Sequence, residues 1–246
     1  MNYLGKVPVG RVLIENNIVS QRSAKSFVKA NDVLVNGVKV CDAGFLVDCS
    51  GDEVCVNGNV LPRVEHVYFA FNKPAGVVCS TVSDSHKTVY DFMRENKKIS
   101  KILMERSLTL HCAGRLDCDT EGLLIFSSNG TFTNALTRPE NNIEKTYLVT
   151  LENSVSSQEQ NEYIRKINAG VKVPAEKKSG EFTARGAKVV FRNSTLCEIT
   201  VTEGKFHEVR RIFGALGNRV VALKRIKFFE FELGDLKSGE FKEIHL

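Results

Sequence analysis

The hydrophobic and polar positions of this chain repeat with short periods that change along its length, which predicts many short helices and strands. Residues 9–17 repeat apolar positions at helical spacing, and a second helix should follow Ser20, whose hydroxyl is a suitable N-cap. Strand-like runs come next at residues 33–35, 38–40 and 53–56, with the turn Asn36-Gly37 between the first two. Residues 1–61 are therefore predicted to form a small module, and residues 62–66 a linker.

Longer elements are predicted from residue 67 onward. Strand-like runs occupy residues 67–72, 77–81, 123–128, 144–151, 187–191, 196–201 and 219–223, and helical spacing occupies residues 89–97, 132–136 and 155–169. The block 110–122 is polar and punctuated by glycine, so we predict a loop there. Residues 67–246 should thus form a larger unit of mixed helices and strands.

A final helix is predicted shortly after residue 205. The apolar residues Phe206, Val209, Phe213 and Leu216 fall on one face of it, and His207, Arg210 and Arg211 fall on another. The basic side chains should therefore project together from a helix that apolar residues anchor.

The composition is that of a globular protein, with 42% hydrophobic and 26% charged residues among 246. The longest apolar runs are strand-sized, and the first ten residues do not resemble a signal peptide, so we expect a cytoplasmic protein without a membrane segment. The seven cysteines are odd in number and show no CxxC spacing, which suggests neither a disulfide framework nor a metal site.

The net charge of +5 is modest, but the basic residues are clustered. Arg22, Lys25 and Lys29 occur within 21–31 without any acid. The segment 204–227 contains Lys205, Arg210, Arg211, Arg219, Lys224, Arg225 and Lys227 against the single acid Glu208. Two basic patches indicate an extended polyanion as partner, although either patch alone could be an ordinary solvated surface.

The block 110–122 offers several candidates for acid–base chemistry. Asp117, Asp119 and Glu121 are all acidic, and His111 and Cys118 lie nearby in sequence. An aspartate in a glycine-rich loop is usually a turn former, so residue types alone do not choose among these acids. The spacing matches no P-loop, dinucleotide fingerprint or metal cage.

Two ordered sets of motifs resemble known families. Residues 20–25, 33–37 and 52–54 resemble the S4 RNA-binding domain, in which the basic helix lies against the RNA backbone. The stretches 72–76, 114–124, 144–147 and 203–211 resemble the pseudouridine synthases of the RsuA type, and Val78-Cys79-Ser80-Thr81 looks most like the small-subunit enzymes of that family. The resemblance implies isomerisation of uridine to pseudouridine in ribosomal RNA.

The same resemblance implies roles for individual residues. Asp117 matches the catalytic carboxylate, Tyr147 the active-site tyrosine, and Arg210 the basic residue that keeps the carboxylate ionised. Leu223 matches an apolar pocket residue, Arg115, Lys73, His207 and Arg211 are expected to bind the substrate, and Arg22, Lys25 and Lys29 are expected to bind RNA phosphates. Whether Asp117 acts as nucleophile or base stays open.

We therefore expect an α+β protein, in which an S4-like module precedes a catalytic domain with a mixed, mostly antiparallel sheet and a central cleft. It should act as a monomer on ribosomal RNA, with the small-subunit RNA as the favoured substrate, and without a cofactor or metal. Three alternatives remain: a non-catalytic S4-containing assembly factor, an RNA N-glycosidase, and a synthase for large-subunit rRNA or tRNA. The last is kept because residues 226–229 read Ile-Lys-Phe-Phe where the family usually has Ile-Gly.

Overall fold

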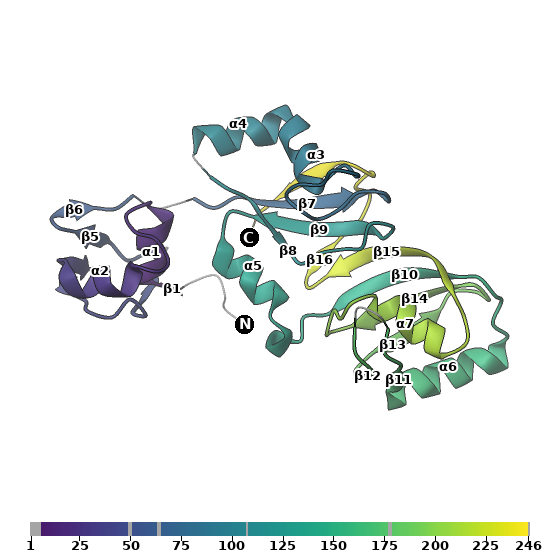
Figure 1. The fold of residues 1–246 in the computed structure, drawn as a ribbon. Helices are drawn as coiled ribbons and strands as arrows, with labels where there is room; N and C mark the ends of the chain where they lie inside the picture. The colour runs from purple at the N-terminus through teal and green to yellow at the C-terminus, as the bar shows by residue number, and fades with distance from the viewer. Residues whose placement is uncertain (1–5, 49–50, 63–64, 107, 177–178, 246) are drawn as a thin grey trace. The chain divides into compact units, whose positions relative to one another are not determined.

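The computed structural model describes residues 6–48, 51–62, 65–106, 108–176 and 179–245. These residues form two compact units, which divide between His66 and Val67. Figure 1 labels the elements of both units. No helix in the described part of the chain is long and apolar enough to cross a membrane.

The N-terminal unit packs two short helices on small sheets. Its elements are β1 (Lys6–Pro8), α1 (Val9–Glu15), α2 (Ala24–Ala30), β2 (Val33–Val35), β3 (Val38–Lys39), β4 (Leu46–Asp48), β5 (Val54–Val56) and β6 (Asn59–Val60). Strands β3, β2, β5 and β6 form one antiparallel sheet, and β1 pairs with β4. The predicted Asn36-Gly37 hairpin is present, and both residues have positive φ, as a tight hairpin turn requires.

The start of α2 differs from the prediction. Ser20 precedes the helix by a full turn: it forms a hydrogen-bonded turn with Ser23, and their hydroxyls lie 2.8 Å apart. The helix itself begins at Ala24, with Ser23 as its N-cap residue. The Ser20 hydroxyl thus hydrogen-bonds with Ser23 within this turn and does not cap α2.

The second unit is built on a nine-stranded mixed sheet. Its strands are β7 (Tyr68–Lys73), β8 (His111–Ala113), β9 (Glu121–Ser127), β10 (Lys145–Leu151), β13 (Lys188–Phe191), β14 (Leu196–Val201), β15 (Val220–Phe228), β16 (Phe231–Glu232) and β17 (Phe241–Ile244). The main order is β13-β14-β10-β15-β9-β7-β17. Only the β9–β15 pair is parallel among these described strands, so the predicted mixed, mostly antiparallel sheet is confirmed.

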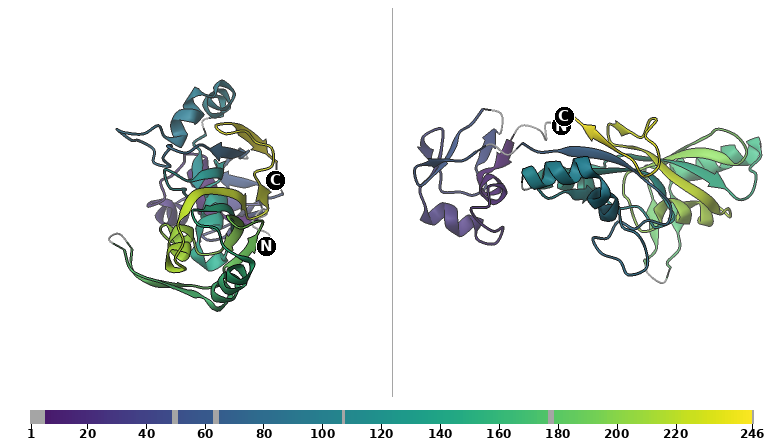
Figure 2. Two further views of the ribbon diagram at one scale, coloured as in Figure 1. Left: turned by 90° about the vertical axis from the view of Figure 1, so that its right-hand side faces the viewer. Right: turned by 90° about the horizontal axis from the view of Figure 1, so that it is seen from above.

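Helices pack against this sheet both near its ends and over its middle strands (Figure 1). They are α3 (Val89–Glu95), α4 (Lys97–Glu105), α5 (Gly130–Thr137), the short η1 (Pro139–Asn141), α6 (Ser157–Ala169) and α7 (Glu208–Ala215). A separate hairpin of β11 (Val171–Val173) and β12 (Phe182–Ala184) extends away from the sheet, as Figure 2 shows. Helix α6 thus lies beside β13 at one end of the sheet, whereas α5 covers the middle strands β9 and β15, which form the parallel junction.

Both faces of the central strands are buried. Phe69, Phe71, Leu124 and Phe126 face the larger core, whereas Ala70, Leu123 and Ile125 face a second core on the other side of the sheet. Alternate residues of a strand point to opposite faces, so burial on both sides explains why residues 123–126 are continuously apolar.

Three local predictions are wrong. Residues 77–81 form no strand, because only Val78 pairs, through an isolated bridge to Thr88. The predicted loop 110–122 contains β8 and the start of β9. The helix predicted over 89–97 ends at Glu95, and α4 begins anew where the Asn96 side chain accepts the Ile99 N–H.

Candidate active site

The parallel junction of β9 and β15 requires a glycine. Gly122 pairs with Arg225 and has φ +105°, a conformation that favours glycine. A Cβ at this position would clash with the Arg225 carbonyl oxygen and would lie 2.7 Å from its nitrogen. Gly122 therefore lets β9 approach β15 closely, directly after the loop that contains Asp117.

A cavity of about 560 Å³ lies beside this junction. Its walls include Arg115, Asp117, Tyr147, Phe206, His207, Glu208, Leu223 and Arg225. This volume is within the usual range for small-ligand sites, roughly 300–1,000 Å³. Five of the predicted site residues, Arg115, Asp117, Tyr147, His207 and Leu223, are thus brought to one place by different elements.

The turn that holds Asp117 is fixed by the segment 73–79. The Cys118 carbonyl accepts hydrogen bonds from the Gly76 N–H at 2.8 Å and from Lys73 Nζ at 3.1 Å. On the other side, the Leu116 N–H donates to Cys79 Sγ at 3.3 Å. Both neighbours of Asp117 are therefore anchored, while its own side chain stays one-third exposed at the cavity.

Lys73 has a different task from the predicted one. Its side chain is fully buried, and Nζ donates to the carbonyls of Pro74, Val77 and Cys118 at 2.9, 2.7 and 3.1 Å. An ammonium group has three hydrogens, so none is left for RNA. Burial lowers the pKa of Lys73. This residue positions the Asp117 turn and is not a direct substrate ligand.

Cys79 supports the same turn. A hydrogen bond with Cys112 lowers the pKa of the Cys79 thiol to about 6, although burial opposes the shift. The same contact, together with burial, raises the pKa of Cys112. The Cys79 sulfur also lies 3.5 Å from the Leu116 carbonyl oxygen, so it contacts both polar groups of the Leu116 backbone.

His207 is the basic group that faces Asp117. Its Nε2 lies 3.7 Å from Asp117 Oδ1, and the backbone of His207 is left-handed, with φ 50°. Phe206 stacks on the imidazole at 3.8 Å between ring centroids. Phe206 is 42% exposed and precedes α7, so its predicted place in the apolar face of that helix is wrong.

Arg210 and Arg211 diverge, although they are adjacent. Arg210 Nη2 forms an ion pair with Asp119 at 2.9 Å, and its Nη1 donates to the Val220 carbonyl. The structure thus brings Arg210 to the Asp117 loop but pairs it with the second aspartate. Arg211 is buried and donates to the carbonyls of Pro174 and Gly180 at 2.6 and 2.8 Å. Arg211 holds the β11–β12 hairpin and lies away from the cavity, which corrects its predicted role as a substrate ligand.

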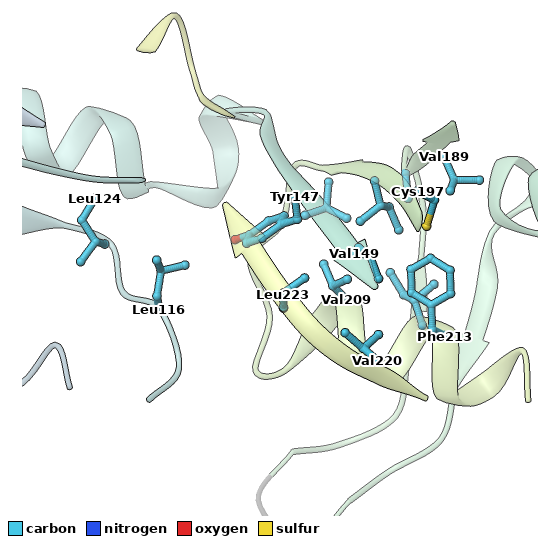
Figure 3. Packing of buried hydrophobic residues seen from close by; sticks show 14 of the residues in the cluster. Leu116, Leu124, Tyr147, Val149, Val189, Cys197, Val209, Phe213, Val220 and Leu223 are labelled. Atoms are coloured by element: carbon cyan, nitrogen blue, oxygen red, sulfur yellow. The ribbon is translucent and has the colours of Figure 1, made fainter. Parts of the chain in front are cut away.

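Tyr147 and Leu223 form the apolar wall of the cavity. Figure 3 shows them with Val149, Val209 and Phe213 in one packed layer. Burial raises the pKa of the Tyr147 hydroxyl, and the nearby Arg225 guanidinium partly opposes that rise. The wall therefore combines a flat ring, an aliphatic side chain and a neutral phenol, which suits a planar heterocycle.

Arg225 and Glu208 also face the cavity and were missed from the sequence as site residues. Both are almost completely buried. Glu208 accepts the Gly204 N–H at 2.7 Å, and burial raises its pKa. Arg225 lies two residues after Leu223 on the same strand, and this period of two was the signal that could have identified it.

The predicted phosphate-binding residues of the N-terminal unit are all exposed. Arg22 precedes α2, and Lys25 and Lys29 lie on it. Elsewhere in the described ranges, no group of three or more His, Cys, Asp or Glu side chains is arranged to hold a metal ion.

Comparison with known proteins finds one family throughout. The signature of the family described as RNA pseudouridylate synthase matches residues 67–215. Ribosomal small subunit pseudouridine synthase A of Escherichia coli (strain K12) is 35% identical over 228 residues, covering 92% of this chain and 91% of that protein. Ribosomal large subunit pseudouridine synthase B of Bacillus subtilis (strain 168) is 31% identical over 239 residues, covering 95% and 90%. A solved structure described as a pseudouridylate synthase has a TM-score of 0.63 and 31% identity, covering 97% of this chain and 96% of that one.

Proposed function

The chain belongs to the RNA pseudouridylate synthase family, and from that premise we propose that it converts one uridine of small-subunit ribosomal RNA to pseudouridine. The observation that carries the proposal is the Asp117 carboxylate, which faces a cavity with Tyr147 and Leu223 in its wall. A carboxylate beside an apolar slot is what the isomerisation needs: one group for the ribose and one surface for the base.

The chemistry explains this arrangement. The base must leave its stack before its sugar can be reached, and a flipped base gains a new partner when an aromatic or apolar side chain covers it. Asp117 then faces the anomeric carbon, where it can stabilise positive charge, add covalently or remove a sugar proton. The base detaches, turns over and reattaches through C5, which then loses its proton, while N1 gains one. No group enters and no oxidation state changes, so the reaction itself requires no cofactor.

Positioning of Asp117 is assigned to the backbone anchors on either side of it. Lys73 and Cys79 hold Cys118 and Leu116, so the carboxylate is oriented without a direct ligand on each oxygen. His207, which lies 3.7 Å from Asp117, is a second group that can meet the RNA at the mouth of the cavity. Preorganised groups of this kind contribute to rate because they need not reorganise during the reaction.

We assign the N-terminal unit to RNA binding as an S4-like module. The exposed Arg22, Lys25 and Lys29 present three cations around one short helix, without an acid among residues 21–31. Such contacts to phosphates position a protein on RNA but carry little sequence information.

The test is to map pseudouridine in both ribosomal RNAs, from cells with and without the gene, by carbodiimide treatment and primer extension. Loss of one stop in small-subunit RNA is the expected result. Loss of a stop in large-subunit RNA would move the target to the subunit named for the Bacillus subtilis relative. If every stop persists in both RNAs, the proposed reaction on ribosomal RNA is refuted.

Two other functions are separated by the product. An N-glycosidase would release free uracil and leave an abasic site, whereas the isomerase retains the base on the RNA. A non-catalytic assembly factor would bind RNA without forming either product. Chromatography of nuclease-digested RNA after incubation with the purified protein distinguishes all three.

A further inference from the structure

Arg225 is a buried cation with an unused donor. It is 1% exposed, and its Nε donates to the Leu123 carbonyl at 2.7 Å. The Tyr147 hydroxyl interacts with the guanidinium, but Nη2 has no hydrogen-bond partner, and among the described residues no acid forms an ion pair with Arg225. The same side chain contributes to the wall of the cavity that contains Asp117.

This arrangement is costly unless a ligand completes it. A buried charged donor without a partner loses its hydration and gains nothing in return, which is unfavourable. The described acids at the cavity do not compensate it: Glu208 accepts the Gly204 N–H, Glu203 pairs with Lys205, and Asp117 faces His207. The guanidinium is held in place by its Nε hydrogen bond and by the Phe228 ring, whose centroid lies 4.6 Å from Cζ. A residue that lines the cavity therefore carries a fixed N–H donor without a partner.

We propose that Arg225 binds a carbonyl oxygen of the flipped uracil and stabilises the negative charge that this base acquires when it detaches. The inference rests on the proposed function and adds a catalytic residue to it. When the C1′–N1 bond breaks, both electrons remain with the base, and the charge spreads over N1 and the two carbonyl oxygens. Asp117 compensates the positive sugar carbon, and Arg225 compensates the negative base.

The surroundings of Arg225 favour a base over a phosphate. Tyr147 is its neighbour across the strands, and Leu223 lies two residues away on the same face. The guanidinium is nearly inaccessible to water, which is too deep for the RNA backbone but suitable for an extruded base. An arginine has donors only, so it accepts a carbonyl and gains strength when that oxygen becomes anionic.

Gly122 links the position of Arg225 to that of the Asp117 loop. Gly122 pairs with Arg225 across the parallel junction, and it is the second residue of β9, which follows the loop of Asp117. The close approach of β9 and β15 therefore ties the position of Arg225 to the position of the catalytic loop. The β9–β15 junction therefore places the Asp117 carboxylate and the Arg225 guanidinium at the same cavity.

The test compares two substrates whose leaving groups differ. A small-subunit RNA transcript contains either uridine or 5-fluorouridine at the target, since fluorine makes the detached ring a weaker base and a better leaving group. Single-turnover rates and RNA affinity are measured for the wild type, Arg225→Met and the matched control Arg192→Met. Arg192 is an exposed arginine paired with Glu198, outside the cavity.

We expect Arg225→Met to slow uridine conversion about 100-fold or more, as loss of a preorganised oxyanion donor does, with RNA affinity changed less than about threefold. Consumption of 5-fluorouridine should slow by a factor at least about tenfold smaller, because that base needs less stabilisation. Arg192→Met should keep wild-type rates. An equal loss on both substrates, or no loss on uridine, overturns the role of Arg225.

Two further results would also decide the proposal: an unfolded Arg225→Met variant and an inactive wild type. If circular dichroism shows that Arg225→Met does not fold, the comparison is made on Arg225→Lys, which should lose more rate on uridine than on 5-fluorouridine; equal losses overturn the proposal. If the wild type converts neither substrate in any RNA, the proposed function fails and this inference with it. An active wild type with an unaffected Arg225→Met refutes the inference alone.

Discussion

The two units of this protein use basic side chains in opposite ways. In the N-terminal unit, Arg22 and Lys25 and Lys29 of α2 are exposed. In the second unit, Lys73, Arg211 and Arg225 are buried and donate to backbone carbonyls at 2.6–3.4 Å or keep a donor for the cavity. We propose that equal formal charge thus serves two purposes: attraction of a polyanion in water, and precise placement of the Asp117 loop in the core.

The difference lies in solvation. An exposed cation is screened within about 8–10 Å at physiological salt, so its contribution depends on ionic strength and on how many such groups act together. A buried cation is poorly screened and must have partners in fixed positions. Changes in the second unit should therefore stop the chemistry or unfold the domain, whereas changes on α2 should weaken RNA binding.

The largest effect is expected for Asp117→Asn. Loss of the carboxylate should reduce the single-turnover rate of pseudouridine formation by more than about 1,000-fold, because Asp117 is the group proposed to act on the ribose. RNA affinity, measured by filter binding, should stay within about threefold. Asp119→Asn is the matched control, since Asp119 is exposed and paired with Arg210. If Asp117→Asn keeps its activity and Asp119→Asn loses it, the catalytic role belongs to Asp119.

The next effect is on stability. Lys73→Met should remove three hydrogen bonds to carbonyls around the Asp117 turn, lowering the free energy of unfolding by about 2–4 kcal/mol. In a domain of this size that corresponds to a fall in Tm of roughly 4–16 °C by calorimetry. Lys98→Met on the exposed face of α4 is the control and should change Tm by less than about 2 °C. Equal Tm values for both variants would mean that the buried lysine contributes no more than a surface one.

A purely electrostatic effect is expected from α2. Replacement of Arg22, Lys25 and Lys29 together by Gln should weaken RNA binding and reduce the slope of log affinity against log salt by up to about 2–3, near 0.7–0.9 for each phosphate contact. The single-turnover rate at saturating protein should be unchanged. If the slope stays the same while affinity falls, the three residues act through the structure of the module and not through phosphates.

The smallest effect concerns a buried acid. Burial raises the pKa of Glu208, so the native state holds this proton more tightly than the unfolded chain does. The associated stability is fully present below the unfolded pKa and is lost as pH rises through the higher folded pKa. Glu208→Gln keeps an acceptor for the Gly204 N–H and should raise Tm by roughly 2–4 °C near pH 8 but not near pH 4. A gain of equal size at both pH values would show that ionisation of Glu208 is not the cause.

Much of the fold was predictable because local patterns agree with the final burial. The apolar run 123–126 and the Asn36-Gly37 turn both correspond to elements of the structure. Prediction failed where pairing is decided by distant partners. Residues 111–113 form a strand only because β9 lies beside them, and residues 77–81 form none because only Val78 finds a partner.

The sequence by itself determined the family, the mixed sheet and the identity of Asp117 as the candidate carboxylate, because these depend on ordered motifs and on period. It could not separate Arg210, Arg211 and Arg225, which are three equal charges in one basic segment. Tertiary structure placed one on Asp119, one under a hairpin and one in the cavity wall. The physical reason is that burial and hydrogen-bond partners are set by strands far apart in the chain, and only their meeting at the β9–β15 junction gives each charge its environment.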